Sequence, residues 1–541
     1  MLVFVAVITT VGTSATPPPS IPAWQLPQFH FSPACLNNSG WHDIAGAITF
    51  GDAHHIFQGC PKSGGWNHAT STDLVHWNDL GITMLAMQES YQNMSSDTSP
   101  CSGFVSTSTD GGDEVCAGFR QCTSSAGVTG LNPKANKWDV PLEVRCAKHA
   151  NLTEWGEPEY FFPVYYYRAL PYDPVRPWLD RDGKWYFTIA TDGCNATTRK
   201  TPCAAGGQLS LWKATHFRGP WWQVDPLFTT NMTKSGTANR PGHITAEFVT
   251  PNYIGGLPGD PDGGKTRIVM QSGYWTHQSF WVGQQEPGWP FSAYWDRPGA
   301  VGQHDYGDLF MARTLGSTNS NQVAVNGRRV MIGWISACCG GGCIDPFASQ
   351  SLPRDLSLSP EYELLQKFVP ELKILREDSG SSVNAPANAA SMQLEIFAVF
   401  GFNVSAPPTE RFGVEVLVSP DGRNSTKLFV DCTRGHDGSM CSVGIDGSNC
   451  TAEHRRRPGP IAVGPLLPVI SHPPKMNGEI VRVTLHAYVD HGIVEVIFNN
   501  RTAFAFSALD PGDGWGGARL FGTVPQNHTL QTWNLKGIYD E

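Results

Sequence analysis

Three short acidic segments in the first half of the chain carry residue types that could do chemistry on a sugar. They are Trp41–Gly46 around Asp43, Tyr172–Pro174 around Asp173, and Ala246–Phe248 around Glu247. Cleavage of a glycosidic bond with retention of configuration requires a carboxylate nucleophile and a carboxylic acid on opposite sides of the bond. A third carboxylate that binds sugar hydroxyls would strengthen the transition state. The chemistry that these residue types suggest is therefore that of a retaining glycosidase.

The length and composition of the chain indicate what kind of fold positions these side chains. It has 541 residues, which is too many for one ordinary core, so we expect two domains. The 57 Gly and 41 Pro residues and the low charged fraction of 16% are typical of many short strands joined by turns. The formal net charge of -10 argues against nucleic acid or an anionic membrane surface as a partner.

Residues 1–20 resemble a secretory signal. The short apolar run Met1–Ile8 is followed by small residues and by the proline run Pro17–Pro19. This run is too short to span a bilayer, and no other stretch is long and apolar enough, so no membrane contact is predicted. We expect a protein that enters the secretory pathway and is secreted, extracellular or vacuolar.

The cysteines and the glycosylation sequons agree with secretion. The chain has 14 Cys, an even number, which predicts disulfides. Asn-x-Ser/Thr sequons, which predict N-glycans, occur at Asn37, Asn93, Asn151, Asn195, Asn231, Asn403, Asn424, Asn449, Asn500 and Asn527.

Local disulfide pairs are expected among three groups of cysteines. These are Cys101, Cys116, Cys122 and Cys146 among themselves, Cys194 with Cys203, and Cys432, Cys441 and Cys450 in part. The cluster Cys338, Cys339 and Cys343 could suggest a metal site, but its spacing fits no zinc pattern. No metal is predicted.

Short apolar or alternating runs bounded by Gly, Pro, Asn and Asp recur from residue 25 to residue 365. They predict strands at Ala47–Phe50, His55–Phe57, Lys184–Ala190, Gln208–Trp212, Arg267–Met270 and Arg329–Trp334. So many antiparallel strands must avoid free edges, and the radial blades of a propeller do so.

A helix is expected over residues 360–377, with a linker over 366–390. The remaining region, 391–541, has clean alternation, which predicts a two-sheet β-sandwich. The strands expected there are Gln393–Phe397, Phe412–Val418, Ile480–Leu485 and Ile493–Phe498. This domain could bind glycans, shape a catalytic groove, mediate a homodimer or only cover the first domain.

Six segments, in order along the chain, resemble segments of glycoside hydrolase family 32, the invertases, fructan hydrolases and fructosyltransferases. They are Trp66–Trp77, Ser102-Gly103, Asp305–Ala312, Gly327–Trp334, Leu352–Leu356 and Val489–Val496. The resemblance covers almost the whole chain. It implies an all-β fold, a five-bladed β-propeller followed by a C-terminal β-sandwich.

The resemblance also implies roles for the three carboxylates. Asp43 would be the nucleophile, Asp173 would bind fructose hydroxyls in the transition state, and Glu247 would be the acid/base. Burial and neighbouring carboxylates would raise the pKa of Glu247 so that it holds its proton near neutral pH. The flanking residues depart from the family wording, with Tyr172 in place of Arg and Phe248 in place of Cys.

Substrate binding would involve amides that bond hydroxyls and aromatic walls that stack on sugar faces. The predicted residues are Trp41, Gln58, Trp66, Ser102, Phe104 and Tyr172. Trp66 could equally be a core residue. Asp180 and Asp182 are rival carboxylates, but Asp182-Gly183 is interpreted as a hairpin turn.

The implied substrate is sucrose, a fructo-oligosaccharide or a fructan, and no metal or organic cofactor is needed. Hydrolysis and fructosyl transfer both stay open, because the choice depends on loop geometry. Two alternatives also stay open: a non-catalytic glycan-binding relative, and a five-bladed glycosidase with altered sugar specificity.

Overall fold

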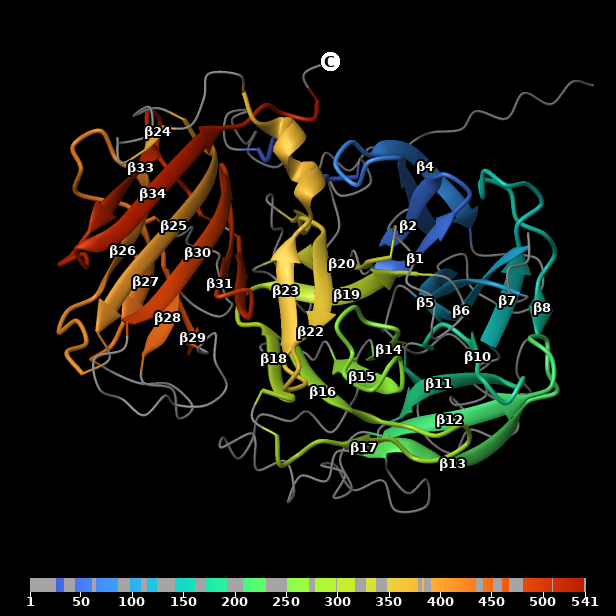
Figure 1. Cartoon of the computed structure of the whole chain (residues 1–541). Helices are drawn as coiled ribbons and strands as arrows, with labels where there is room; N and C mark the ends of the chain where they lie inside the picture. The colour runs from blue at the N-terminus through green and yellow to red at the C-terminus, as the bar shows by residue number, and fades with distance from the viewer. Residues whose placement is uncertain are drawn as a thin grey trace, which may run out of the picture.

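The regular structure of the chain is almost entirely β-strand (Figure 1). The computed structural model describes residues 26–33, 44–60, 65–85, 98–108, 114–123, 142–160, 171–172, 174–191, 208–229, 251–271, 278–297, 299–316, 327–336, 348–377, 382–383, 391–403, 405–433, 441–450, 460–466, 480–507 and 509–539. The expected all-β class is confirmed. Among these residues no helix has the length and apolar character needed to cross a bilayer.

Five antiparallel sheets follow one another along the first two thirds of the described chain, each built from strands that are close in sequence. The first contains β1 (Ile44–Phe50), β2 (Ala53–Cys60), β3 (Gly65–Ser71) and β4 (Asn78–Leu85). The second contains β5 (Thr98–Thr107), β6 (Val115–Thr123), β7 (Leu142–Cys146) and β8 (Glu159–Tyr160).

The next three sheets have five strands each. The third contains β9 (Pro171–Tyr172), β10 (Trp178–Leu179), β11 (Trp185–Thr191), β12 (Gln208–Ala214) and β13 (Trp222–Thr229). The fourth contains β14 (Pro251–Gly255), β15 (Thr266–Gln271), β16 (Gln278–Gln284), β17 (Ser292–Ala293) and β18 (Val301–Asp305). The fifth contains β19 (Leu309–Leu315), β20 (Arg329–Ile335), β21 (Ser349–Gln350), β22 (Arg354–Leu358) and β23 (Leu364–Phe368).

Strand β1 lies between neighbouring sheets and is buried on both of its faces. Ile44 packs in an apolar cluster with Leu315 and Val330 of the fifth sheet. Ile48 packs in a second cluster with Val105 of the second sheet. Two buried faces explain why the run reads as continuously apolar rather than alternating. They also place the start of β1 where the first, second and fifth sheets meet.

The prediction of a helix over residues 360–377 is wrong. Leu364–Phe368 forms strand β23, and only the 3-10 helix η5 (Pro370–Leu375) follows it. Burial alternates along β23, with Leu364, Gln366 and Phe368 inside, so the period is that of a strand. Pairing with β22 and the buried amide of Gln366, which donates to two backbone carbonyls, decide the conformation over local helix propensity.

Two further antiparallel sheets form the C-terminal part of the chain and share one apolar core. The first contains β24 (Ser382–Val383), β25 (Gln393–Asn403), β30 (Ile480–Asp490), β31 (Ile493–Phe498), β32 (Thr502–Phe506) and β34 (Asn527–Asn534). The second contains β26 (Phe412–Val418), β27 (Thr426–Asp431), β28 (Ser442–Asp446), β29 (Ile461–Pro465) and β33 (Gly516–Phe521). All four strands expected from the alternation are present.

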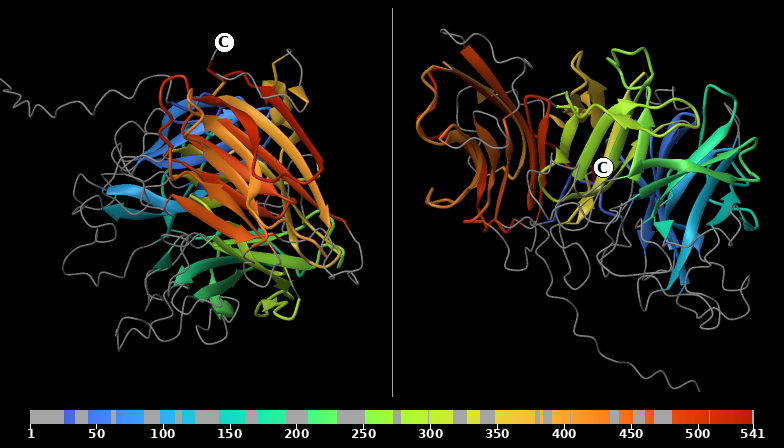
Figure 2. Two further views of the ribbon diagram at one scale, coloured as in Figure 1. Left: turned by 90° about the vertical axis from the view of Figure 1, so that its left-hand side faces the viewer. Right: turned by 90° about the horizontal axis from the view of Figure 1, so that it is seen from below.

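These C-terminal sheets lie beside the fourth and fifth sheets and far from the second (Figures 1 and 2). A buried ionic network joins the two parts. The guanidinium of Arg354, on β22, donates to Asp305 at 2.9 Å and to Glu495 of β31 at 2.5 Å, and all three side chains are fully buried. Burial raises the pKa of Asp305 to about 6, although the charge of Arg354 opposes this.

His30, from the segment before β1, completes the network. Its Nδ1 lies 2.8 Å from Asp490 and its Nε2 lies 3.2 Å from Glu495, and the ring is fully buried. Burial alone would lower the pKa of His30, but the bonds to Asp490 and Glu495 outweigh it and raise the pKa to about 9. The imidazole is therefore a buried cation held by two carboxylates.

Two of the expected disulfides are present. Cys116–Cys146 joins directly paired positions of β6 and β7, and Cys432–Cys441 joins the ends of β27 and β28. Cys450 is a free, buried thiol. The predicted Cys194–Cys203 pair lies outside the described residues.

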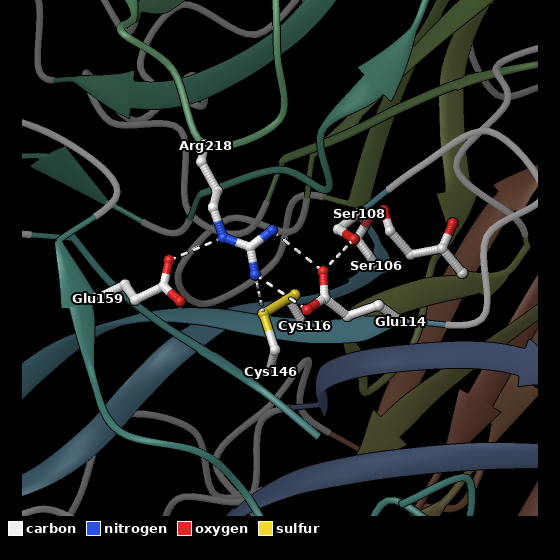
Figure 3. Close-up of a disulfide and its surroundings, with 8 residues drawn as sticks. Ser106, Ser108, Glu114, Cys116, Cys146, Glu159 and Arg218 are labelled. Carbon is white, nitrogen blue, oxygen red and sulfur yellow. Dashed lines mark hydrogen bonds and ion pairs between the residues drawn. A yellow bond between two sulfur atoms is a disulfide. The ribbon is translucent and has the colours of Figure 1, made fainter. Parts of the chain in front are cut away.

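Figure 3 shows how the first disulfide sits beneath an ionic clamp between sheets. Arg218, from the loop between β12 and β13, bonds Glu159 at 2.8 Å and Glu114 at 3.0 Å, both from the second sheet. Its Nη2 atom also lies 3.3 Å from the Cys146 sulfur. The clamp ties the second sheet to the third at a partly exposed position.

Candidate active site

The predicted catalytic side chains themselves are not described. Asp43, Asp173, Glu247 and Trp41 lie outside the described residues. Ser102 lies on β5 and Tyr172 on β9, and only their backbone placement is described. The assigned roles of these residues therefore stay predictions, and the surrounding strands carry the structural argument.

Each predicted carboxylate adjoins the first strand of a different sheet. Ile44 opens β1 directly after Asp43, and Tyr172 closes β9 directly before Asp173. Strand β14 begins at Pro251, four positions after Glu247. In sequence, the three carboxylates are therefore next to strands of the first, third and fourth sheets.

Gly46 allows β1 and β5 to come close beside the predicted nucleophile. A Cβ atom at this position would lie 2.5 Å from Val105 Cγ2 and 2.9 Å from the Val105 backbone nitrogen. Both distances are shorter than a side chain tolerates. The register of β1 against β2 also shifts between Ile44 and Gly46, which marks a bulge. Bulges commonly re-aim neighbouring side chains, and here the neighbour in sequence is Asp43.

Arg313 is a buried residue that the sequence interpretation missed. It lies on β19 with 5% of its surface exposed. Its Nε donates to the Ile44 carbonyl at 3.2 Å and its Nη2 donates to the Gly103 carbonyl at 3.1 Å. One guanidinium therefore holds the residue after Asp43 and the residue after Ser102. The signal available in the sequence was a charge inside the apolar run Leu309–Leu315.

Arg176 makes similar bonds from the third sheet. Its guanidinium donates to the carbonyls of Ala47 on β1 and of Thr314 and Gly316 of the fifth sheet. Burial, with the nearby charges of Arg329 and Arg313, lowers the pKa of Arg176 to about 9. Arg176 follows Asp173 by three positions, so it anchors the chain that carries the second carboxylate.

Arg329 adds a bond to the fourth sheet. Its Nη2 donates to the Gly255 carbonyl of β14 at 2.8 Å. Burial, with the charge of Arg267, lowers the pKa of Arg329 to about 10. Together Arg176, Arg313 and Arg329 tie the first strands of four sheets to one another through neutral carbonyl acceptors.

Gln58 is a predicted substrate-binding residue with a buried side chain. It lies on β2 opposite Ile44 and is 1% exposed. Its Oε1 and Nε2 atoms have no hydrogen-bond partner among the described residues. An unpaired buried amide costs free energy, so such a group needs an explanation. A hydroxyl of a bound ligand would satisfy it.

Trp66 and Phe104 occupy apolar cores rather than an open wall. Trp66 is fully buried and packs edge-on against Phe119 at 5.2 Å between ring centroids. Phe104 is 2% exposed and belongs to a cluster with Trp185 and Phe187. This placement fits the core role that the sequence analysis left open for Trp66. Stacking of either ring on a sugar stays a prediction.

The rival carboxylates are engaged elsewhere. Asp182 lies in the turn between β10 and β11 and accepts bonds from Lys184, Tyr186 and Lys213. Burial would raise the pKa of Asp182, but the bond from Tyr186 and the others outweigh it and lower the pKa. The interpretation of Asp182-Gly183 as a hairpin turn is confirmed.

One cluster of metal-ligating residue types occurs among the described residues. One ligand atom from each of Glu114, Cys116 and Cys146 lies within 4.8 Å of the others. The two sulfurs are joined in a disulfide and the guanidinium of Arg218 adjoins them. An oxidised pair supplies no thiolate ligand, so this arrangement does not suit a cation. The cysteine cluster 338–343 lies outside the described residues.

Comparisons with known proteins agree on one family. The family profile described as "Glycosyl hydrolases family 32 C terminal" matches residues 366–534. The chain is 24% identical to an acid beta-fructofuranosidase of Phaseolus vulgaris, over 93% of this chain and 78% of that protein. It is 23% identical to an extracellular exo-inulinase of Aspergillus niger, over 94% of this chain and 95% of that protein.

Solved structures show the same fold. A crystal structure of fructan 1-exohydrolase IIa from Cichorium intybus in complex with 1-kestose superimposes with a TM-score of 0.70. The alignment covers 96% of this chain and 98% of that chain at 17% sequence identity. The arrangement of sheets is therefore shared, while most side chains differ.

Proposed function

Because the chain belongs to glycoside hydrolase family 32, we propose that it is a retaining glycoside hydrolase that acts on the β-fructosyl linkages of sucrose or fructans. The observation that carries the proposal is the buried amide of Gln58, which has no hydrogen-bond partner among the residues that the structure describes. It lies beside the residue that follows Asp43, where a sugar hydroxyl would complete its hydrogen bonds. Family membership alone would not predict a buried amide without a partner beside Ile44.

In the proposed reaction the carboxylate of Asp43 attacks C2 of the fructosyl unit, and the bond from C2 to the leaving oxygen breaks. Glu247 donates its proton to that oxygen. Glu247 then removes a proton from water, whose oxygen attacks C2 and releases Asp43. If a sugar hydroxyl replaces the water, the product is a longer oligosaccharide. Asp173 binds hydroxyls of the fructosyl ring throughout.

The arginine bonds support this division of roles. Arg313 and Arg176 bring positive charge to the first strands of the sheets that carry Asp43 and Asp173. Positive charge near a carboxylate favours its ionised form. The nucleophile and the hydroxyl-binding carboxylate both need that form. The acid/base must keep a proton, and Glu247 precedes strand β14 of the fourth sheet in sequence.

The finer architecture is also a proposal. Five consecutive antiparallel sheets and two sheets around a separate core support a five-bladed β-propeller near the predicted bounds 25–365 and a β-sandwich near 391–541. Strands β23 and β24 extend these two parts into the linker predicted over 366–390. The disulfides and the sequons support passage through the secretory pathway, and relatives of this chain include vacuolar and extracellular enzymes. N-glycans and a homodimer belong to the same proposal.

Product analysis with the full-length secreted protein tests the activity. Equal glucose and fructose from sucrose at mildly acidic pH would indicate hydrolysis, and glucose in excess with longer oligosaccharides would indicate transfer. Asp43→Asn and Glu247→Gln are expected to abolish turnover, while the turn variant Asp182→Asn keeps it. Full activity in either of the first two variants would refute the role of that residue.

The altered residues beside the carboxylates favour two alternatives. Tyr172 stands where the family has an arginine that contacts fructose, so a change in sugar specificity is the first. A glycan-binding protein without catalysis is the second. No turnover of sucrose, inulin or levan, combined with saturable binding of a fructan, would favour the second over the first.

A further inference from the structure

The outer face of the six-stranded C-terminal sheet contains a hollow of about 780 Å³. Its lining includes Gly401 of β25, Ile480 and Arg482 of β30, and Asn527 and His528 of β34. The size falls within the roughly 300–1,000 Å³ typical of sites for small molecules. The hollow lies in the C-terminal sheets, away from the strands that adjoin the predicted carboxylates.

Gly401 forms the floor of this hollow. It pairs with Asn527 on one side and with Arg482 on the other. A Cβ atom on Gly401 would lie 3.3 Å from the Asn527 carbonyl oxygen and 3.4 Å from Ile480 Cγ2. Because successive residues of a strand face opposite sides, a side chain here would rise between the two neighbouring strands and fill the hollow.

Ile480 makes one wall of the hollow unusually apolar for an outer face. Its side chain is 53% exposed. The opposite wall is polar, because it contains the exposed side chain of Asn527. Asn527 is also the first residue of the sequon Asn527-His528-Thr529. Arg482, which pairs with Gly401, adds hydrogen-bond donors. A ligand that suits this lining has an apolar face and many hydroxyl or amide groups.

We propose that Asn527 carries an N-linked glycan whose first two N-acetylglucosamine units lie in this hollow, over Gly401 and against Ile480. The Nδ2 atom of Asn527 forms a bond to C1 of the first sugar, the lipid diphosphate of the oligosaccharide donor leaves, and Nδ2 loses one proton. The apolar face and methyl group of the sugar cover Ile480, while Arg482 bonds its oxygens. The inference does not depend on the proposed catalytic activity.

The tether favours this occupant over a free ligand. A sugar attached to a lining residue has a high effective concentration at the hollow, so weak contacts suffice to seat it. A free sugar would have to bind an open, shallow surface without that advantage. The seated glycan would also cover the apolar patch at Ile480.

Asn403 supplies a matched control at the same end of the sheet. It opens its own sequon, pairs with Ile480 and is exposed, but it does not line the hollow. Its Oδ1 accepts a bond from the backbone nitrogen of Ser405 at 2.8 Å. A glycan on Asn403 would extend from the end of β25 into solvent.

The test uses the full chain secreted from a eukaryotic host that adds high-mannose glycans. Mass spectrometry of the peptides gives the occupancy of each sequon. Endoglycosidase H then releases glycans from the native protein, and the rates at Asn527 and Asn403 are compared. Release at Asn527 is expected to be about tenfold slower, because a seated population of roughly nine in ten leaves one tenth open to the enzyme.

Two variants separate seating from general inaccessibility. Gly401→Leu fills the hollow and Ile480→Ser removes its apolar wall, so either is expected to bring the rate at Asn527 up to that at Asn403. The second variant keeps the test informative if the first does not fold. An unoccupied Asn527, equal rates in the unmodified protein, or slow release that neither folded variant changes would each overturn the proposal.

Discussion

Replacement of His30 by glutamine should remove a pH-dependent part of the stability of this protein. His30 is fully buried between Asp490 and Glu495, and its pKa is raised from 6.5 to about 9. At 1.36 kcal/mol for each pKa unit, that difference corresponds to roughly 3 kcal/mol. A raised pKa in the folded state means that protonation favours folding. The contribution is therefore complete below pH 6.5 and is lost as the pH rises through about 9.

The measurement is the free energy of unfolding in urea for the unmodified protein and for His30→Gln, at about pH 6 and about pH 10, on either side of this interval. The difference between the two proteins is expected to shrink by roughly 3 kcal/mol from the lower to the higher pH. His149→Gln is the control. The His149 side chain is 62% exposed and its nearest carboxylate contact is 3.8 Å, so its effect should stay within about 1 kcal/mol.

Two outcomes would refute the reasoning. If the stability difference between the unmodified protein and His30→Gln is the same at both pH values, His30 is not a cation in the folded state. If the difference grows with pH, the sign of the pKa change is wrong. At acid pH the carboxylates act in the opposite direction. Burial would raise the pKa of Asp490, but the bond from His30 and other contacts lower it, so this part of the stability is lost as the pH falls through the lowered pKa.

Three further substitutions test the buried hydrogen bonds, the buried ionic network and the close approach of two strands. Arg313→Met removes the guanidinium that bonds the carbonyls of Ile44 and Gly103, at a cost to stability of about 1–3 kcal/mol per group. In sucrose hydrolysis this variant should lower kcat more than it raises KM. An unchanged kcat would contradict a positioning role for Arg313. Arg354→Met leaves two buried carboxylates uncompensated and should lower the unfolding free energy by about 3–5 kcal/mol, against about 0–1 kcal/mol for the partly exposed Arg519→Met. Gly46→Ala forces β1 away from β5 and should reduce kcat, with far-UV circular dichroism as the check that the sheets persist.

Local pattern was sufficient for the strands that the sequence analysis named and for the two groups of cysteines within which disulfides form. The apolar run of β20 and the alternation of β25 and β30 are signals carried by adjacent residues, so they can be interpreted without the fold. The same local logic failed over residues 360–377. There, Gln366 has long-range partners in the backbone of His304 and Arg501, which no window of neighbouring residues contains.

Three of the segments that resemble the family contribute to one buried network, which only the folded structure shows. Asp305, Arg354 and Glu495 come from three separate segments that resembled the family, and the fold brings them into one buried network. A sequence shows that such residues are present. It does not show that each charge is matched by another that lies 49 or 141 positions away. That matching is what makes burial of the charges tolerable.

The sequence by itself determined the all-β class, the resemblance to the family and the order of the three carboxylates, because these depend on residue types and on their order along the chain. Tertiary structure alone decided that Trp66 is buried and that the buried amide of Gln58 has no partner among the described residues. It also decided that Arg313 holds the backbone beside Asp43 and Ser102. The physical reason is that burial and hydrogen bonding between sheets depend on which distant residues meet.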